Sequence, residues 1–470
     1  MSWSRGKRRI VSSLQWCCLV AAASLVHSQE EPPVLLVTGG TVVTMDAGHQ
    51  VFDPGAVAVA GSRIVAVGEA AGVGARYPAA RTLDTTGRIV LPGLVNAHTH
   101  VPMTLFRGLA DDLELMDWLQ EHIFPAEAKM VDEELVRWGT RLACLEMLRG
   151  GTTTFADMYY FEDAIAEEVD RCGMRAVLGE TLVDFPSPDH ATWEGAIEYT
   201  ERFLERWRDH PRIVPAVAPH APYTVSGEHL IAAHALAETH DAPLLVHLAE
   251  DRSEVRTIRE RHGRGPVEYL SGLGVLSDRV LAAHVIWPTE GEMRLLAARG
   301  VGVAHCPQSN MKLAAGIAPV PRLLELGVAV GLGTDGPASN NDLDLWDEMD
   351  TAAKLHKVAL GDPTAMDART TLRLATLGGA EALGLASEIG SLEVGKRADL
   401  VVVRTDGYHQ TPWFDPYSLL VYSTKASDVE SVMVEGEWVV RDGSVRTVDE
   451  QAVRKRVATY RAAMAPAPPE

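Results

Sequence analysis

Cysteine is scarce in this chain of 470 residues, which contains five. Cys17 and Cys18 fall in an N-terminal segment that we expect to be removed, which leaves Cys144, Cys172 and Cys306 far apart in the sequence. Three scattered cysteines exclude a disulfide framework, and their spacing excludes a zinc finger. We therefore expect buried free thiols.

Positive charge is also in short supply. The chain has 43 lysines and arginines against 64 acidic residues, a formal net charge of −21. A nucleic-acid-binding surface needs a clustered basic face that displaces counterions from phosphates. The acidic balance therefore argues against nucleic acid as a partner. Hydrophobic residues make up 46% of the chain and charged residues 23%, which is typical of a folded globular protein.

The sequence lacks a hydrophobic run suited to a membrane span. The best candidate, residues 10–26, is interrupted by Ser12, Ser13 and Gln15 and follows a basic stretch. This pattern predicts a signal peptide over residues 1–28 and hence an exported, periplasmic protein. The Arg8-Arg9 pair leaves both Sec and twin-arginine export open. The alternative is a cytoplasmic protein whose start site has been placed too far upstream.

Short apolar runs alternate with helical segments through the middle of the chain. Eight α/β units of this kind predict a (β/α)₈ TIM barrel over residues 89–385. The β-rich segments 29–88 and 386–470 predict one small β-sandwich built from both chain ends, with a frayed C-terminal tail. The eight expected barrel strands cover residues 89–97, 152–158, 176–182, 213–218, 244–248, 280–283, 301–304 and 328–332.

Polar residues recur at the C-terminal ends of these expected strands. They are His98 and His100 on the first strand, His247 on the fifth, His284 on the sixth and Asp335 after the eighth. Residues i and i+2 of a strand share a face, so both imidazoles of the first strand can enter the barrel mouth. Catalytic groups of TIM barrels lie at this end. The alternative, five unrelated structural residues, does not explain their recurrence there.

Imidazoles and a carboxylate together suit Zn²⁺, with Fe²⁺ or Mn²⁺ also feasible. An ion with an open position activates water as a nucleophile, so hydrolysis is the natural chemistry. No lysine occurs between Lys129 and Lys312, a span that includes the second to sixth expected strands. A binuclear centre bridged by a carboxylated lysine on the fourth strand is therefore excluded, and we expect one ion per chain.

Several segments carry a resemblance to a known family. They are residues 96–103 (NAHTHVPM), 219–223 (PHAPY), 247–250 (HLAE) and 333–341 (GTDGPASNN), together with 40–46 and 395–400 near the two ends. In these segments the chain resembles the amidohydrolase superfamily. It is most similar to the mononuclear branch of 5′-methylthioadenosine/S-adenosylhomocysteine deaminases, near the triazine hydrolases. The resemblance implies a zinc-dependent deaminase that releases ammonia from a 6-aminopurine nucleoside: 5′-methylthioadenosine, S-adenosylhomocysteine or adenosine.

The resemblance also implies roles for single residues. His98, His100, His247 and Asp335 match the metal ligands of the family, and Asp335 also passes a proton to the departing ammonia. His284 matches the imidazole that orients the attacking hydroxide. Glu250 matches the group that protonates the purine ring, and its position three residues after a ligand suits general acid–base work. The alternative for Glu250 is a solvated side chain in an acidic loop.

Substrate contacts follow from the same resemblance. Glu127 and Trp118 lie 27 and 18 residues after His100, where the family has a carboxylate for ribose hydroxyls and an aromatic lid. His220 and Ser339, with Glu250, match further substrate contacts. The alternatives are a charge on a surface helix for Glu127, ordinary packing for Trp118 and structural roles for His220 and Ser339.

One residue departs from the family pattern. Glu180 stands where members that bind homocysteine carry an arginine, and a glutamate there would repel a substrate carboxylate. We therefore expect a neutral heterocycle as small-molecule substrate. Separately, we expect the enzyme to be a homo-oligomer. The alternatives are a deaminase or chlorohydrolase for another ring, such as a triazine, guanine or pterin, and a scaffold without catalysis.

Overall fold

The computed structural model describes residues 33–464. The predicted signal peptide, residues 1–28, and residues 465–470 of the predicted tail lie outside this range. No helix among the described residues has both the length and the apolarity that a membrane span needs.

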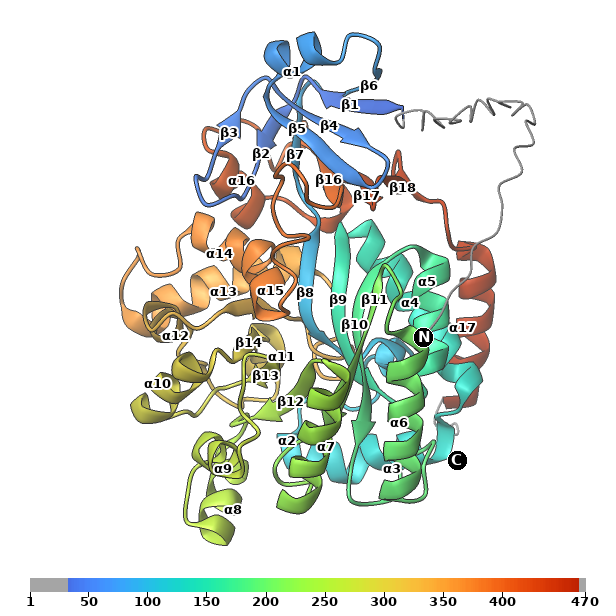
Figure 1. Ribbon diagram of the computed structural model, residues 1–470, viewed down its shortest axis with the longest axis vertical. Coiled ribbons are helices and arrows are strands. Elements are labelled where there is room, and N and C mark those ends of the chain that lie inside the picture. Colours follow the sequence, from blue (N-terminus) through green and yellow to red (C-terminus); the bar gives the residue numbers. More distant parts are fainter. Residues whose placement is uncertain (1–32, 465–470) are drawn as a thin grey trace, which may run out of the picture. The chain divides into compact units, whose positions relative to one another are not determined.

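Eight parallel strands form the barrel, and each pairs with the next strand along the chain (Figure 1). The ring closes where the backbone N–H of Asp335 donates to the carbonyl of His98 at 3.0 Å. The predicted (β/α)₈ barrel is thus confirmed. Its strands are β8 (Leu94–Thr99), β9 (Thr152–Tyr159), β10 (Arg175–Leu182), β11 (Ile213–Pro219), β12 (Leu244–Leu248), β13 (Val280–His284), β14 (Gly302–His305) and β15 (Val330–Leu332).

The prediction of one strand over residues 89–97 is wrong, because this segment contains parts of two strands. β7 (Arg88–Pro92) belongs to a separate sheet and β8 to the barrel, with Gly93 between them. A Cβ at Gly93 would overlap the side chain of Thr153, so only glycine lets the chain pass so close to β9. Both strands are apolar, and the hydrophobic pattern therefore could not reveal the break.

Helices surround the barrel, and several begin with a side-chain cap. Asp132, for example, accepts a hydrogen bond from the N–H of Leu135 at 2.8 Å at the start of α4 (Glu133–Arg149). The other helices of the barrel region are α5 (Glu162–Cys172), α6 (Trp193–Trp207), α7 (Gly227–His240), α8 (Arg252–His262), α9 (Pro266–Leu273), α10 (Glu290–Arg299), α11 (Pro307–Lys312), α12 (Val320–Glu325), α13 (Leu345–Leu360), α14 (Ala368–Leu374) and α15 (Leu377–Ala382).

The connection between β8 and α4 is a chain of short helices instead of a single turn. It contributes residues to the cavity described below. Its elements are η1 (Val101–Phe106), α2 (Leu115–Asp117), the π-helix η2 (Trp118–Ile123) and α3 (Phe124–Met130).

Two further sheets lie beyond the N-terminal ends of the barrel strands, at the top of Figure 1. A seven-stranded sheet combines strands from both chain ends, as predicted. In order across the sheet they are β19 (Ser444–Val445), β18 (Glu437–Arg441), β17 (Val429–Val434), β16 (Leu400–Arg404), β7, β2 (Thr41–Val43) and β3 (Val51–Phe52). A four-stranded sheet comes from the N-terminal part alone: β5 (Arg63–Glu69), β4 (Gly55–Ala60), β1 (Val34–Thr38) and β6 (Arg81–Asp84).

The two end sheets share one hydrophobic core, to which Val37 and Val57 of the smaller sheet and Val90 and Leu400 of the larger sheet contribute. Helices α1 (Ala70–Arg76), η3 (Ala426–Asp428), α16 (Pro416–Tyr422) and α17 (Glu450–Met464) interrupt these β-rich segments. The sequence pattern did not indicate α17, which packs against α4 of the barrel.

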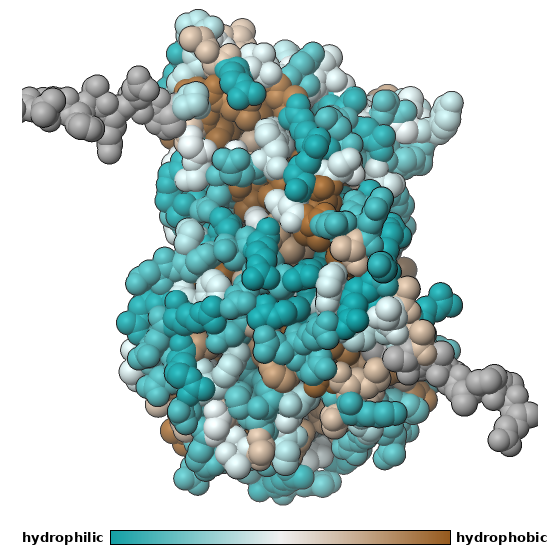
Figure 2. Space-filling model, turned by 90° about the vertical axis from the view of Figure 1, so that its right-hand side faces the viewer, coloured by the Kyte–Doolittle hydropathy of each residue, from teal (hydrophilic) through white to brown (hydrophobic). Residues whose placement is uncertain are grey.

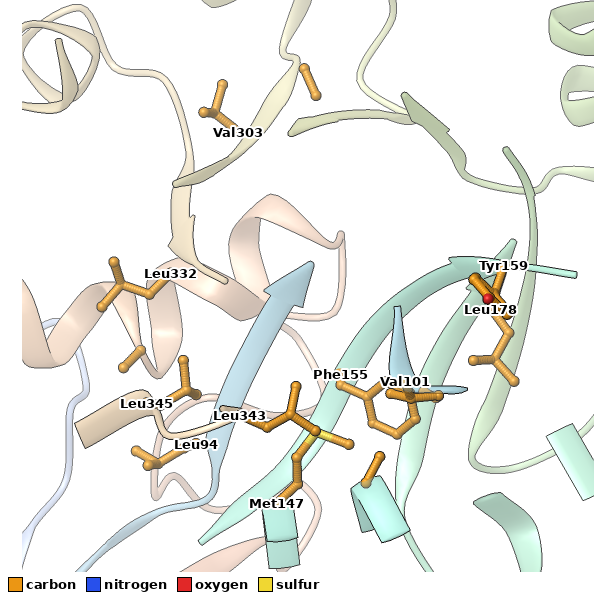
Figure 3. Packing of buried hydrophobic residues seen from close by; sticks show 14 of the residues in the cluster. Leu94, Val101, Met147, Phe155, Tyr159, Leu178, Val303, Leu332, Leu343 and Leu345 are labelled. Atoms are coloured by element: carbon orange, nitrogen blue, oxygen red, sulfur yellow. The ribbon is translucent and has the colours of Figure 1, made fainter. Parts of the chain in front are cut away.

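The largest hydrophobic core lies between the barrel strands and their helices. Figure 3 shows part of it, including Met147 of α4 and Phe155 of β9, which are fully buried. Burial of such side chains stabilises the fold by roughly 1.5–3 kcal/mol each. Cys144, Cys172 and Cys306 are buried and free, as predicted. The surface in Figure 2 is mostly hydrophilic, with larger hydrophobic patches in the upper half, where the end sheets lie.

Candidate active site

The C-terminal ends of the barrel strands surround a cavity that collects most of the predicted site residues. Those that line it are His100, Trp118, Glu127, His220, His247, Glu250, His284 and Asp335. These residues come from the ends of separate strands and, in the case of Trp118 and Glu127, from the short helices after β8. Only the closed barrel therefore brings them together.

Three of these side chains, those of His100, His247 and Asp335, form with His98 a compact set of potential metal ligands. Nε2 of His98 and Nε2 of His100 lie 3.4 and 3.2 Å from Oδ1 of Asp335. Nε2 of His247 lies 3.3 Å from Nε2 of His100. Two nitrogens bound to one tetrahedral zinc ion would be about 3.4 Å apart. The donor spacing therefore fits a single ion of that size.

An unsatisfied buried atom points to the same conclusion. Nε2 of His98 is buried and has no hydrogen-bond partner among the described residues. The ligand atoms of His98, His100 and His247 lie within 4.8 Å of one another, as do those of His98, His284 and Asp335. Buried polar atoms are normally paired, so these groups suit a ligand that is an ion.

Hydrogen bonds behind the ligands fix their orientation. Nδ1 of His100 bonds the carbonyl of Met158 at 2.6 Å, and Nδ1 of His247 bonds the carbonyl of His220 at 2.9 Å. Each Nδ1 therefore carries the proton, which leaves Nε2 free as a metal ligand.

Asp335 is held in a similar way by its own neighbours. Its Oδ2 accepts hydrogen bonds from the hydroxyls of Ser309 and Ser339 at 2.6 and 2.7 Å. Its Oδ1 accepts from the N–H of Gly336 at 2.7 Å and faces the histidines. One oxygen is thus anchored by the protein while the other is directed toward the ligand set.

The electrostatics of the cluster favour a cation. Burial lowers the pKa of His98 to about 4 and holds that of His247 well below its usual range, so both rings are neutral. Burial also acts against a charged His100, but the Asp335 and Asp157 carboxylates raise its pKa to about 9. The negative charge of Asp335 thus attracts a positive charge to this point.

Glu250 and His284 face each other beside the ligand set, with Oε1 and Nε2 3.6 Å apart. Burial raises the pKa of Glu250. The N–H groups of Ala249 and Glu250 both donate to Glu254, at 2.9 and 2.8 Å, which fixes the turn after β12. Ala249, His284 and Asp335 have φ of 51°, 72° and 62°. Left-handed backbone at non-glycine residues often clusters at functional sites.

Glu127 also lines the cavity and is buried. The hydroxyl of Tyr159 donates to its Oε1 at 2.7 Å. Burial raises the pKa of Glu127 to about 7, although the hydrogen bond from Tyr159 opposes this shift. The alternative of a solvated charge on a surface helix is therefore wrong.

Two further predicted residues complete the walls. Trp118 begins η2 and is buried, and its Nε1 has no partner among residues 33–464. His220 follows β11, bonds the hydroxyl of Thr224 through Nδ1 at 3.0 Å, and has its ring 4.7 Å from that of His247. Burial lowers the pKa of His220 to about 3, so its ring is neutral.

Ser339 does not line the cavity. It is buried behind Asp335, to which its hydroxyl donates. This geometry favours a role in positioning Asp335 over the predicted contact with substrate.

The expectation about Glu180 is wrong in its physical basis. Its neighbour Thr181 lines the cavity, and side chains alternate along a strand, so Glu180 points away from the cavity. Its Oε2 accepts from the N–H of Glu162 in α5 at 3.1 Å. Glu180 is therefore not placed to repel a substrate carboxylate in the cavity.

Three supporting residues were missed from the sequence. Asp157 on β9 accepts hydrogen bonds from the hydroxyl of Thr99 and from the N–H of Val101, the residues on either side of His100 at the end of β8. Asn310 bonds Nδ1 of His284 through Oδ1 at 2.9 Å. Ser309 bonds Asp335, as described above. Asp157 could have been found from the sequence, because it is a charged residue within a largely apolar strand. Ser309 and Asn310 lie in the short helix α11 after β14, where nothing in the sequence sets them apart.

A wider groove continues outward from the cavity. Five residues belong to both spaces: Leu119, Phe124, Glu127, Tyr160 and Tyr223. Farther out, the groove is lined largely by apolar residues that include Phe185, Pro186, Pro222 and Tyr269. Its basic residues are Arg261 and His262, both exposed at the end of α8.

Comparison with known proteins is consistent with this geometry. Residues 89–439 match the model of the amidohydrolase family. The 5-methylthioadenosine/S-adenosylhomocysteine deaminase of Syntrophobacter fumaroxidans is 53% identical over 418 residues, which cover 89% of this chain and 95% of that protein. The corresponding deaminase 1 of Syntrophus aciditrophicus is 45% identical over 90% of this chain and 95% of its own length.

Solved structures show the same relationship. An adenosine deaminase from Xanthomonas campestris with bound zinc is 42% identical and superposes with a TM-score of 0.90, covering 92% of this chain and 99% of that one. An atrazine chlorohydrolase from Arthrobacter aurescens TC1 complexed with zinc is 26% identical, with a TM-score of 0.84 over 91% of this chain and 99% of that one.

Proposed function

The chain belongs to the amidohydrolase family, and from that premise we propose that it is a zinc-dependent hydrolase that releases ammonia from 6-aminopurine nucleosides. In the reaction, water adds at C6 of the purine, the C6–N bond breaks, and a 6-oxopurine and ammonia are formed. The observation that carries the proposal is that one cavity brings together the ligand set, Glu250 and the buried carboxylate of Glu127.

His98, His100, His247 and Asp335 would hold one Zn²⁺ ion, and Fe²⁺ or Mn²⁺ fits the same donors. When bound, the ion supplies the Lewis acidity that lets water attack at neutral pH. The zinc in the Xanthomonas campestris adenosine deaminase supports this choice of metal.

Glu250 would transfer the proton that the reaction needs. It takes a proton from the attacking water and delivers it to the ring nitrogen beside C6, which makes the ring a better electron acceptor. A carboxyl group whose pKa is raised by burial is suited to hold that proton between the two steps. Asp335 would pass a second proton to the amino group, because the amide ion is a very poor leaving group.

His284 would orient the attacking water. The Oδ1 of Asn310 lies 2.9 Å from Nδ1 and accepts its proton, which favours the tautomer whose Nε2 is the hydrogen-bond acceptor. That nitrogen faces Glu250 and can accept a hydrogen bond from the water. His284 and Glu250 would thus each accept a hydrogen bond from the attacking water and so orient it.

Glu127 supports a nucleoside over a simple ring. Its Oε1 is satisfied by Tyr159, and Oε2 makes no hydrogen bond to another described residue. A carboxylate so placed can accept hydrogen bonds from ribose hydroxyls, while Trp118 and His220 bound the rest of the cavity. A triazine carries no such hydroxyls. Triazines are nevertheless the second candidate substrate class, because the chain is also similar to an atrazine chlorohydrolase.

An ammonia-release assay tests the proposal. Zinc-loaded protein would be supplied with 5′-methylthioadenosine, S-adenosylhomocysteine, adenosine, guanine and an aminochlorotriazine, and ammonia and chloride would be followed. We expect ammonia from at least one adenosine-type nucleoside. Activity confined to the triazine or to guanine would overturn the substrate proposal.

A further inference from the structure

A second group of potential metal ligands lies outside the cavity and the groove. It consists of Glu180, Asp189 and His190, whose ligand atoms lie within 4.8 Å of one another. Glu180 comes from β10 and is fully buried, while Asp189 and His190 come from the segment between β10 and α6. None of the three lines the cavity or the groove, so the deamination chemistry does not use them.

Neighbouring residues hold the two carboxylates in place. Glu180 accepts from the N–H of Glu162 through Oε2 at 3.1 Å. Asp189 accepts from the N–H of Phe161 at 2.8 Å and from the hydroxyl of Ser187 at 2.8 Å. These bonds involve the start of α5 and the segment before α6, so the cluster joins two loops at one end of β10.

Two atoms of the cluster are buried without a partner. With both carboxylates ionised, Oε1 of Glu180 and Nε2 of His190 make no hydrogen bond among the described residues. Nε2 of His190 lies 3.8 Å from Oδ2 of Asp189. An unpaired carboxylate oxygen and an unpaired imidazole nitrogen in one small space both suit a ligand that accepts electron pairs.

The negative charge of the cluster is not balanced by a lysine or an arginine of the described residues. Within residues 33–464, neither Glu162, Glu180 nor Asp189 forms an ion pair with a lysine or arginine. Burial, then the charge of Asp189 and a side-chain hydrogen bond with it, and then the Glu162 carboxylate, raise the pKa of Glu180 well above its usual range. Carboxylates this close need either a shared proton or a cation between them.

We propose that Glu180, Asp189 and His190 bind a second divalent metal ion, separate from the ion in the cavity. Two carboxylates and one imidazole are donors that suit Zn²⁺ or Mn²⁺. The unpaired Nε2 of His190 favours an ion over a shared proton, because a proton between the carboxylates would leave that nitrogen without a partner.

Such an ion would act on the groove wall. The segment that carries Asp189 and His190 also supplies Phe185, Pro186 and Pro188 to the groove. An ion that ties this segment to Glu180 would hold the wall against the barrel. The proposal rests on the cluster itself and not on the reaction in the cavity.

Zinc stoichiometry of the full chain tests the second site. Protein stripped with a chelator would be reloaded with zinc, freed of loosely held ions, and analysed for zinc per chain. We expect two ions in the wild type and one in both Glu180→Gln and His190→Gln. Glu167→Gln, a carboxylate-to-amide change on α5 away from the cluster, should keep two. Amides of residues 184–190 should exchange at least tenfold faster in Glu180→Gln than in the wild type.

A wild type that saturates at one zinc would overturn the proposal and leave a shared proton as the explanation. A folded Glu180→Gln variant that keeps two ions would overturn the assignment of these ligands. If Glu180→Gln does not fold, the zinc content of His190→Gln gives the same test, because His190 is less buried than Glu180. Binding of two ions without deamination would count against the proposed function alone. Deamination with only one bound ion would count against the second site alone.

Discussion

The inner end of the cavity and the outer groove are built differently. At the inner end, side chains such as His247 and Asp335 stand on or directly after barrel strands and are fixed by hydrogen bonds at 2.6–2.9 Å. The groove is lined by loops and short helices, and its lining residues are mostly apolar, such as Phe124 and Phe185. Strand ends can hold reacting groups rigidly, whereas loops can change shape and side chains without disturbing the barrel.

This contrast separates the reaction from the choice of substrate. Changes at the inner end should abolish turnover whatever the substrate, while changes in the groove should alter the preference among substrates. Glu127 and Tyr223 belong to both spaces and mark the boundary. Substitutions placed from the inner end outward test this division.

The largest effect is expected for Glu250→Gln. The amide keeps the shape of the side chain but cannot transfer a proton, so kcat should fall by about 10³ to 10⁴ for every substrate. Bound zinc should be unchanged, because Glu250 is not one of the ligands. Glu260→Gln, an exposed residue on α8, serves as the matched control. Retention of more than a tenth of the wild-type kcat would remove Glu250 from the mechanism.

Glu127→Gln should have the next largest effect and should act on binding. Loss of charge-assisted hydrogen bonds to ribose costs about 1.5–3 kcal/mol, so kcat/KM should fall by roughly 10- to 100-fold through KM. Steady-state kinetics with a nucleoside and with its free base measure this, since the free base lacks the ribose and should be unaffected.

Glu127 also predicts a pH dependence. The carboxyl group must be ionised to accept two hydroxyl protons, and burial raises its pKa to about 7. In the wild type, kcat/KM for the nucleoside should therefore rise as the pH increases through about 7 and fall progressively below it. The Glu127→Gln profile should lack this step; an identical profile in both proteins would assign the titration to another group.

The inner end could be predicted from sequence for a physical reason. A strand has a period of two and a barrel places all strand C-terminal ends on one face, so the sequence alone assigns His98, His100 and His247 to one site. The direction of Glu180 is harder to predict, because the period of two gives the alternation along β10 but not which of its faces meets the cavity. Ser309 and Asn310 could not be found, because their contacts join segments that only the folded chain brings together. Export through residues 1–28 and homo-oligomerisation stay predictions.

Ser339→Ala tests whether support behind a ligand matters as much as contact with substrate. The change removes one of two hydroxyls that bind Oδ2 of Asp335 and leaves Ser309 in place. Partners of this kind typically contribute 10- to 100-fold to metal affinity, and with one partner retained we expect about tenfold. Competition with a zinc chelator measures the affinity. A raised KM with unchanged zinc affinity would instead restore the substrate contact predicted from sequence.

The smallest effect is expected in the groove, and it should depend on the substrate. If Glu127 binds ribose at the boundary, the 5′ substituent extends outward toward Phe185. A methylthio group packed on that ring gains about 1 kcal/mol from burial of its apolar surface. Phe185→Ala should therefore lower kcat/KM for 5′-methylthioadenosine about fivefold and leave adenosine within twofold. An equal loss for both substrates would show that Phe185 supports the wall of the cavity instead of selecting among substrates.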